Sequence, residues 1–351
     1  MDARRPKPAE TPRACGPLTT VVLATPEAGA SGTFIIIDVL SSVGRLWEAL
    51  HGEEIKPPVF RPRLLSFDGA RYVNPIGIEV APHGALSDEP APDIVIIPEL
   101  QLGLSGELPP SYAPIVDWLK AAHAQGALLC AVCSGTVLLA ATGLLDGEDA
   151  ATHWGYCTVM ARRHPHVRVR KERVLVPAGI GHRLVTSGAA SSWDDLLLYL
   201  VARFAGQEQA RRVAKVFLLN AHPQGQLPFA SLAAVPHEDE MVAEAQAWIA
   251  EHYKGASPVA AMAARGGLTE RTFLKRFRRA TGLSPMEYVQ VLRIEEAKHL
   301  IEATDLPLDE IAAEVGYAEP ASFRRLFRRK VGLSPSAYRR QRLPPLAAVE
   351  G

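Results

Sequence analysis

Several features are scarce or missing in this 351-residue sequence, and each absence argues against a class of protein. Four irregularly spaced cysteines are too few for the disulfide framework of a secreted domain. The sequence has no run of 18 apolar residues and no apolar signal-peptide core near its start, so we expect a cytoplasmic protein without a membrane span. Net charge is also missing, with 38 basic against 38 acidic residues, which by itself argues against a nucleic-acid partner.

What is present is the composition of a globular protein, with 48% hydrophobic and 22% charged residues. A chain of this length predicts two or three domains. Between residues 18 and 222, apolar runs alternate with helical patterns: we expect strands at 19–24, 63–66, 93–98, 127–132 and 184–186, and helices at 37–50, 113–125, 134–142, 156–163 and 192–203. This alternation predicts an α/β domain with a mainly parallel sheet.

Outside that domain the sequence changes character. We expect a disordered tail at residues 1–17, a linker at residues 223–237, which contain three prolines, an all-helical domain at residues 238–343 and a short tail at residues 344–351.

The helical region contains an internal repeat. Residues 263–288 align without a gap on residues 313–338, at an offset of fifty, and 11 of the 26 positions are identical. Each copy has a short helical pattern, 259–265 or 308–315, then a glycine-containing turn and a second helical pattern, 269–280 or 320–330. This order predicts two helix-turn-helix motifs.

Each second helix has two different faces. Phe273 and Phe277 lie four residues apart and predict a buried face, as Phe323 and Phe327 do in the second copy. Basic residues cover the opposite faces: Arg271, Lys275 and Arg278 in the first copy, and Arg324, Arg325 and Arg328 in the second. A charged helix face is usually only solvated, but its recurrence at the same place in both copies favours contact with double-stranded DNA. The balanced total charge therefore does not exclude DNA.

The segment between the two copies, residues 285–303, predicts a single helix of about 28 Å. Such a helix would place the two second helices roughly one turn of DNA apart, near 34 Å. One chain would then contact two successive segments of the major groove.

The repeat also carries a family resemblance. Gly316-Tyr317, the run Phe323-Arg324-Arg325-Leu326-Phe327-Arg328-Arg329 and the run Gly332-Leu333-Ser334-Pro335 are similar to the signature of AraC/XylS-type transcription regulators, over about residues 238–342. The resemblance implies a sequence-specific DNA-binding regulator of transcription. It also implies that outward residues of both second helices contact base edges and phosphates: Thr269, Glu270, Arg271, Thr272, Lys275, Arg278, Ala321, Ser322, Arg324, Arg325 and Arg328.

In the first domain, the most informative stretch is the turn Cys133-Ser134-Gly135 between a predicted strand and a predicted helix. A cysteine at the N-terminus of a helix is expected to favour the thiolate form. This stretch resembles the class I glutamine-amidotransferase-like superfamily, in the branch of PfpI-type proteases, and the resemblance covers about residues 18–220. It implies a flavodoxin-like sheet with helices on both faces, in a branch where such a domain often precedes an AraC-type module.

The resemblance is incomplete at positions that catalysis requires. Enzymes of the superfamily have an acidic residue in the first strand–helix loop, where this sequence has Ser31-Gly32-Thr33, and a glycine pair after the third strand, where it has Pro98-Glu99-Leu100. The acidic residues left to substitute are Glu27, Asp38 and Glu99. We therefore expect no enzymatic activity, with Cys133 and His153 as remnants; the alternative is a cysteine-dependent hydrolase or amidase that uses both.

We expect instead that this domain binds a small molecule and forms a homodimer. The pocket would be lined by Cys133, Ser134, His153, Trp154 and Trp193, although His153 and Trp154 could equally be buried, hydrogen-bonded core residues. Trp193 beside Asp194 would suit a cationic ligand such as an amine or an amino acid. No cofactor motif or metal-ligand spacing is present, so we expect neither.

The pair Cys130 and Cys133 has the spacing of a redox motif. On an extended strand the two residues lie about 10 Å apart, which argues against a disulfide. Oxidation of Cys133 alone remains open.

Overall fold

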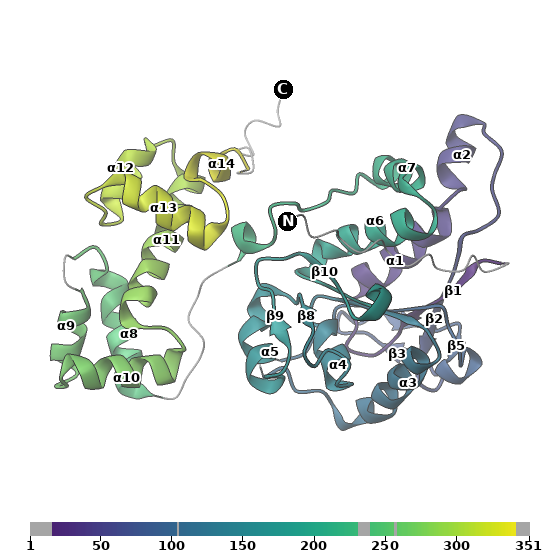
Figure 1. Cartoon of the computed structure of the whole chain (residues 1–351), viewed down its shortest axis with the longest axis horizontal. Helices are drawn as coiled ribbons and strands as arrows, with labels where there is room; N and C mark the ends of the chain where they lie inside the picture. The colour runs from purple at the N-terminus through teal and green to yellow at the C-terminus, as the bar shows by residue number, and fades with distance from the viewer. Residues whose placement is uncertain (1–15, 104, 231–238, 256–257, 342–351) are drawn as a thin grey trace, which may run out of the picture. The chain divides into compact units, whose positions relative to one another are not determined.

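The computed structural model describes residues 16–103, 105–230, 239–255 and 258–341 and divides the chain into two compact units, Met1–Gln226 and Leu227–Gly351 (Figure 1). The tail predicted at 344–351, most of the tail predicted at 1–17 and residues 231–237 of the predicted linker lie outside the described residues. Within the described part, no helix combines the length and the apolar character that crossing a lipid bilayer requires.

The N-terminal unit is built on a sheet that has seven strands within the described residues. In spatial order they are β10 (Leu175–Ala178), β11 (Leu184–Ser187), β7 (Leu128–Val132), β6 (Ile94–Ile97), β1 (Leu18–Leu23), β2 (Phe60–Ser66) and β5 (Gly84–Ala85). All pairings are parallel except that of β10 with β11. The order β2-β1-β6-β7-β11 is the flavodoxin-like order, which confirms the predicted fold class.

Helices cover both faces of this sheet (Figure 1). Alternate strand residues face opposite sides. Val22 belongs to the core formed with α1 (Ala30–Ser42), α6 (Trp193–Phe204) and α7 (Gln207–Phe217). Val21 belongs to the core formed with α3 (Ala113–Ala124), α4 (Gly135–Ala141) and α5 (Cys157–Arg163). Because both faces are covered, all four residues of β6 are buried and apolar.

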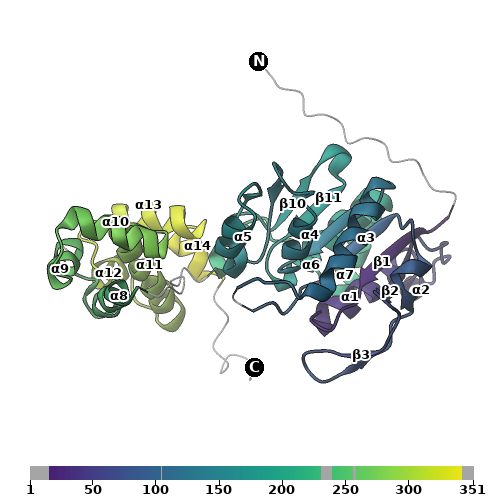
Figure 2. The same cartoon turned by 90° about the horizontal axis from the view of Figure 1, so that it is seen from below.

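The N-terminal unit differs from the prediction in several places. The helix expected at 37–50 is two helices, α1 and α2 (Leu46–His51), because Val43 is extended and Gly44 has a φ of +74°. The sequence does not predict α7. It also does not predict β10, because Pro177 argues against a strand although it is tolerated at the sheet edge, where β10 lies. It also does not predict the hairpin of β3 (Tyr72–Val73) and β4 (Glu79–Val80), which projects from the sheet (Figure 2). A further short pair is β8 (Asp149–Ala150) with β9 (Arg168–Val169).

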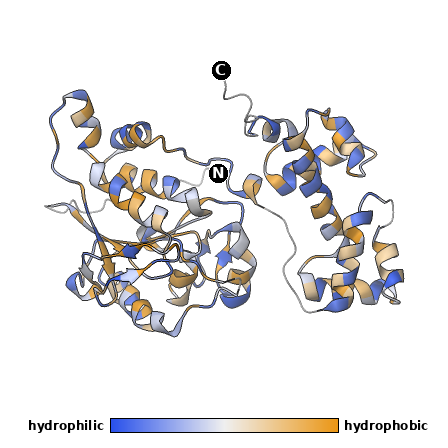
Figure 3. Ribbon diagram, turned by 180° about the vertical axis from the view of Figure 1, so that it is seen from behind, coloured by the Kyte–Doolittle hydropathy of each residue, from blue (hydrophilic) through white to orange (hydrophobic). Residues whose placement is uncertain are grey.

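The C-terminal unit is helical. It contains α8 (Glu240–His252), α9 (Pro258–Arg265), α10 (Glu270–Thr281), α11 (Pro285–Ala303), α12 (Leu308–Glu314), α13 (Pro320–Val331) and α14 (Pro335–Arg339). The helix pairs α9–α10 and α12–α13 are the two predicted helix-turn-helix motifs. Orange and blue stretches alternate along these helices in Figure 3, as amphipathic helices with one buried face should show.

Each half of the C-terminal unit has its own core. Phe273 and Phe277 are fully buried in the first half, where the Phe277 ring lies 5.5 Å from that of Tyr288. Phe323 and Phe327 are equally buried in the second half, with Tyr338 5.6 Å from Phe327. The repeat in the sequence is therefore a repeat in packing.

Helix α11 joins the two halves as a continuous helix of 19 residues. Its start is fixed by a capping box: the Ser284 hydroxyl accepts from the Glu287 backbone, and the Glu287 carboxylate accepts from the Ser284 N–H at 2.9 Å. Pro285 fits the first turn, where its missing N–H costs nothing. The predicted connecting helix is confirmed with its predicted bounds.

Candidate functional site

Helices α10 and α13, here called the recognition helices, each bury their phenylalanines and expose the opposite face. Thr269 is the N-cap of α10, and its hydroxyl accepts from the Thr272 backbone N–H. Among the residues expected to contact DNA, Ser322 is half-buried and the others are exposed: Thr269, Glu270, Arg271, Thr272, Lys275, Arg278, Ala321, Arg324, Arg325 and Arg328. Each recognition helix thus presents a basic surface to solvent.

The basic residues of the two recognition helices differ in their partners. Arg276 of α10 is turned inward, where Nε and Nη2 donate to Asp239 at 2.9 and 3.0 Å, so its charge serves to hold α10 to the start of α8. On α13, Arg324 forms an ion pair with Asp309, and Arg325 donates to the Ser322 hydroxyl at 2.9 Å. Two arginines of the second recognition helix are therefore held by neighbouring side chains in the absence of DNA.

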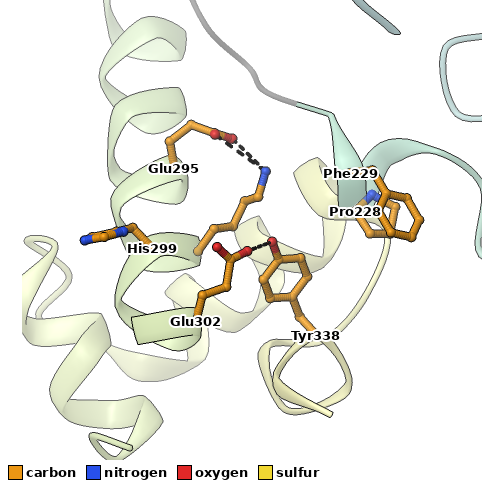
Figure 4. Close-up of a pocket in the computed structure, with 7 residues that line it drawn as sticks. Pro228, Phe229, Glu295, His299, Glu302 and Tyr338 are labelled. Atoms are coloured by element: carbon orange, nitrogen blue, oxygen red, sulfur yellow. Dashed lines mark hydrogen bonds and ion pairs between the residues drawn. The ribbon is translucent and has the colours of Figure 1, made fainter. Parts of the chain in front are cut away.

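A cavity of about 390 Å³ lies beside the C-terminal half of α11, within the C-terminal unit (Figure 4). Most of its polar groups are paired: buried Lys298 donates to the Ala230 carbonyl at 2.7 Å and to Glu295 at 3.2 Å, and the Tyr338 hydroxyl donates to Glu302. The remaining lining residues are Pro228, Phe229 and His299. The hydrogen bond from Lys298 holds the segment 228–230 against α11. None of the residues predicted to bind a ligand lines this cavity.

In the N-terminal unit, the turn at Cys133 is a strained elbow between β7 and α4. Cys133 has a φ of +58°, which is unusual for a residue other than glycine. The Thr152 hydroxyl donates to the Cys133 carbonyl at 2.9 Å, and the Cys133 N–H donates to the Ser187 carbonyl at 3.0 Å. A Cβ at Gly135 would overlap the Pro98 carbonyl, so only glycine lets α4 start this close to the end of β6.

The elbow carries a carboxyl group next to the thiol. The Ser134 hydroxyl donates to the Leu100 carbonyl at 2.6 Å and accepts from the Leu100 N–H at 2.9 Å, which fixes the loop that contains Glu99. The Glu99 carboxyl fills the space where Gly29 and Gly32 lack side chains, at the start of α1. Burial raises the pKa of Glu99, and its Oε2 has no hydrogen-bond partner within the described residues.

The thiol of Cys133 is in its unreactive form at neutral pH. Only 6% of the residue is exposed, and burial, with a smaller contribution from the Glu99 charge, raises the pKa of Cys133 to about 11. The expectation that the helix N-terminus favours the thiolate is therefore wrong here, because loss of hydration outweighs the helix dipole. Cys130, Cys133 and Cys157 are all free thiols, which confirms that the C-x-x-C pair forms no disulfide.

His153 is not placed as a base for Cys133. Its Nδ1 accepts from the Gly155 N–H at 3.0 Å, and burial alone lowers the pKa of His153. Its ring stands 4.7 Å from that of Trp154 and 6.3 Å from that of Tyr156. Within the described residues, no hydrogen bond joins His153 to the thiol, so the activated pair that nucleophilic catalysis requires is missing from this arrangement.

The residues predicted to bind a ligand separate into a buried and a half-buried group. Cys133 and Ser134 are buried, whereas His153, Trp154 and Trp193 are half-buried. Trp193 starts α6 and packs on the same core as Cys133, and next to it Asp194 accepts from the Asn220 N–H through Oδ2 at 3.1 Å. His153 and Trp154 lie next to each other, and Trp193 belongs to the core that contains Cys133.

Sequence reasoning missed two residues that shape this region. Burial raises the pKa of Tyr156, with a smaller contribution from nearby Cys133, and its hydroxyl donates to the Leu102 carbonyl. Gln226 is 1% exposed; its amide donates to the Thr152 carbonyl at 2.9 Å and accepts from the Trp154 N–H at 3.1 Å. Gln226 lies in the predicted linker, where composition gives no sign of a buried residue.

Comparison with known proteins matches each unit separately. The helix-turn-helix domain family matches residues 262–341, and the DJ-1/PfpI family matches residues 41–203. The HTH-type transcriptional regulator GbdR of Pseudomonas aeruginosa is 26% identical over 310 residues, which cover 86% of this chain and 80% of GbdR. CdhR, an HTH-type transcriptional regulator of the same species, is 26% identical over 284 residues, covering 79% of this chain and 81% of CdhR. A crystal structure of an AraC family transcriptional regulator from Pseudomonas putida is 19% identical with a TM-score of 0.47, covering 57% of this chain and 100% of that one.

Proposed function

Because the chain is an AraC-type transcription regulator in which a DJ-1/PfpI domain precedes the helix-turn-helix module, we propose that it binds a two-part DNA sequence under the control of a small molecule. The observation that carries this proposal is the pair of recognition helices, each with a buried aromatic face and an exposed basic face. Such a regulator acts in the cytoplasm, where the chromosome lies.

In this proposal the recognition helices enter successive segments of the major groove. The first turn of each helix, with Thr269, Glu270 and Thr272 on α10 and Ala321 and Ser322 on α13, faces base edges. The longer side chains of Arg271, Lys275, Arg278, Arg324, Arg325 and Arg328 reach guanines or phosphates. The exposure of these side chains and the continuous helix α11 between the motifs support the assignment.

Selection of bound duplexes from a random DNA pool, followed by footprinting of the full chain, tests this proposal. We expect two protected segments whose centres are roughly one helical turn apart. A single protected segment, or binding without sequence preference, would contradict it.

The N-terminal unit is, in this proposal, a sensor without catalytic activity. Three observations argue against a hydrolase: the thiol is buried, the Glu99 carboxyl lies near it, and the His153 Nδ1 accepts from the Gly155 N–H and not from the thiol. Turnover of amide or ester substrates by the full chain that is lost in Cys133→Ser would overturn this assignment and restore the alternative of a cysteine-dependent amidase.

The effector that suits the sensor is a small cation, such as an amine or an amino acid. Asp194 Oδ1 is buried without a hydrogen-bond partner among the described residues, and burial raises the pKa of this carboxyl. A bound cation would compensate for that burial, and half-buried Trp193 beside it offers an aromatic face. His153 and Trp154 are the other residues that we propose to contact this effector.

Tryptophan fluorescence provides the test. Titration with quaternary amines and basic amino acids should give a saturable change that Trp193→Phe and Asp194→Asn abolish. Trp118→Phe, on the opposite face of the sheet in α3, is the matched control and should keep the response. No response across the whole panel would contradict a cationic effector.

We also propose that the sensor forms a homodimer through its hairpin. Four apolar side chains within residues 67–78 are at least half exposed: Phe67 at 51%, Val73 at 60%, Ile76 at 66% and Ile78 at 50%. Exposed apolar groups gathered in this way mark association surfaces, and an isolated two-stranded hairpin is stabilised little by itself. Sedimentation analysis should show a dimer that Ile76→Asp converts to a monomer, and a wild-type monomer would contradict the proposal.

A further inference from the structure

The guanidinium of Arg293, near the middle of α11, joins the two halves of the C-terminal unit. Its Nε donates to the Tyr253 carbonyl at 2.9 Å and its Nη2 to the Gly255 carbonyl at 2.9 Å, both just after α8 in the first half. Its Nη1 donates to the Gly316 carbonyl at 3.0 Å, in the turn of the second helix-turn-helix motif. One planar guanidinium thus holds backbone groups from both halves.

The surrounding contacts bring the two halves together at the same point. The guanidinium carbon lies 5.2 Å from the centre of the Tyr317 ring, and Lys254 forms an ion pair with Glu314. Gly316 has a φ of +87°, and a Cβ there would lie 2.9 Å from the Lys254 carbonyl oxygen. The backbones approach so closely that the turn requires glycine.

This contact belongs to the junction and has no counterpart inside either repeat. Arg293 lies between the two copies of the repeat, 263–288 and 313–338, and the residue fifty positions before it is Ala243. Arg276, in contrast, binds the single carboxylate of Asp239 through Nε and Nη2, within the first half. Arg293 therefore acts between the two motifs, while Arg276 acts inside one.

We propose that Arg293 is a positioning residue that fixes the relative placement of the two recognition helices and so makes DNA affinity depend on the spacing of the two DNA segments. Helix α11 sets the distance between the motifs, and each motif packs on it through a separate core, so direct contacts between the two halves limit how far one motif can rotate relative to the other. The rigid fork of three hydrogen bonds from Arg293 is such a contact. The inference rests on the proposed two-part readout of DNA.

The test compares spacing variants of one DNA duplex, using the full chain. A duplex selected by the wild-type protein is remade with one base pair inserted or removed between the two protected segments. Wild type should lose about tenfold in affinity on each change of spacing, because one segment can no longer be contacted properly. Arg293→Met should bind the original duplex about tenfold more weakly and the altered duplexes unchanged, so that the ratio of affinities approaches one.

Two further variants separate positioning from general damage. Arg293→Lys keeps the charge but not the fork, so it should behave like Arg293→Met. Arg276→Met is the matched control: it removes a bidentate arginine inside one half and should weaken binding to all duplexes alike, leaving the ratio at its wild-type value. If Arg293→Met does not fold, as judged by circular dichroism, Glu314→Gln weakens the same junction and should lower the ratio about twofold, as loss of an exposed ion pair would.

The outcomes distinguish a failure of the Arg293 proposal from a failure of the proposed two-part readout of DNA. A wild-type ratio retained in Arg293→Met and Arg293→Lys overturns the role of Arg293 and leaves the two-part readout intact. A wild-type affinity that does not respond to spacing also overturns it. A footprint of the wild-type chain over only one segment overturns the two-part readout itself, together with this inference.

Discussion

The elbow at Cys133 and the recognition helices treat their polar groups in opposite ways. At the elbow, a thiol and a carboxyl are withdrawn from water, and burial raises the pKa of both. On α10 and α13, long basic side chains are exposed, and some are held by neighbouring residues without being buried. The difference teaches that the strained turn of a reactive cysteine can persist while its reactivity is suppressed, whereas a DNA-binding surface must keep its charges accessible.

The largest effect that would sharpen this comparison is expected from the exposed basic side chains of the recognition helices. Lys275→Ala with Arg325→Ala should lower affinity for the selected duplex by about a thousandfold, since each side chain contributes on the order of 1–3 kcal/mol. Filter binding or fluorescence anisotropy measures the loss. Arg162→Ala, which removes an exposed arginine from α5 of the sensor, is the control and should leave affinity unchanged. Binding unaffected by the double substitution would remove the basis of the comparison.

The next effect concerns the withdrawn thiol. With its pKa raised from 9.0 to about 11, Cys133 should react with iodoacetamide about a hundred times more slowly at pH 7 than an ordinary cysteine. The rate should rise about tenfold per pH unit until the pKa is reached. Mass spectrometry of the peptide that contains Cys133 separates this labelling from that of the other cysteines. Rapid labelling at pH 7 would show that the thiol is not withdrawn.

A moderate effect is expected from the close approach that shapes the elbow. Gly135→Ala places a methyl group against the Pro98 carbonyl, a backbone atom that cannot rotate away, and should destabilise the N-terminal unit by about 1–3 kcal/mol. Gly103→Ala has open space around it and should change stability by less than about 0.5 kcal/mol. Chemical denaturation measures both, and equal values would mean that the elbow tolerates expansion.

The smallest effect is the pH dependence that Glu99 introduces. Because burial raises the pKa of Glu99 above its ordinary value, the folded chain binds this proton more tightly than the unfolded chain. Its contribution to stability is therefore present at low pH and is lost as pH rises through the raised pKa. Glu99→Gln should remove this loss, so the stability difference between the two proteins should change with pH above 4.5. A difference that stays constant from pH 4 to 8 would show that the Glu99 carboxyl titrates normally.

The sequence predicts much of the C-terminal unit because its signals are local and repeated. The phenylalanine pairs, the cap at Thr269 and the connecting helix all follow from spacing within one helix. Arg276 and Arg324 show where this reasoning ends, because their partners Asp239 and Asp309 lie 37 and 15 residues away, outside the helix whose spacing was analysed. Only the folded chain shows which arginines are already paired.

The N-terminal unit is less predictable for the same reason. Apolar runs identify the parallel strands, but the edge strand β10 contains Pro177, and the break at Gly44 divides an otherwise helical pattern. Glu99 is one of three acidic residues that the sequence leaves as equivalent, and its contact with Gly29 and Gly32 selects it. A pKa set by burial depends on neighbours from distant segments, so composition around Cys133 cannot give it.

The separate cores of the two helix-turn-helix halves have a consequence for how such a regulator can evolve. Substitutions on α10 alter one half without disturbing the aromatic packing of Phe323, Phe327 and Tyr338 in the other. A lineage can therefore drift from one target promoter to another through intermediates that still recognise half of the ancestral sequence. Duplicated domains with independent interiors allow regulatory networks to be rewired in small steps.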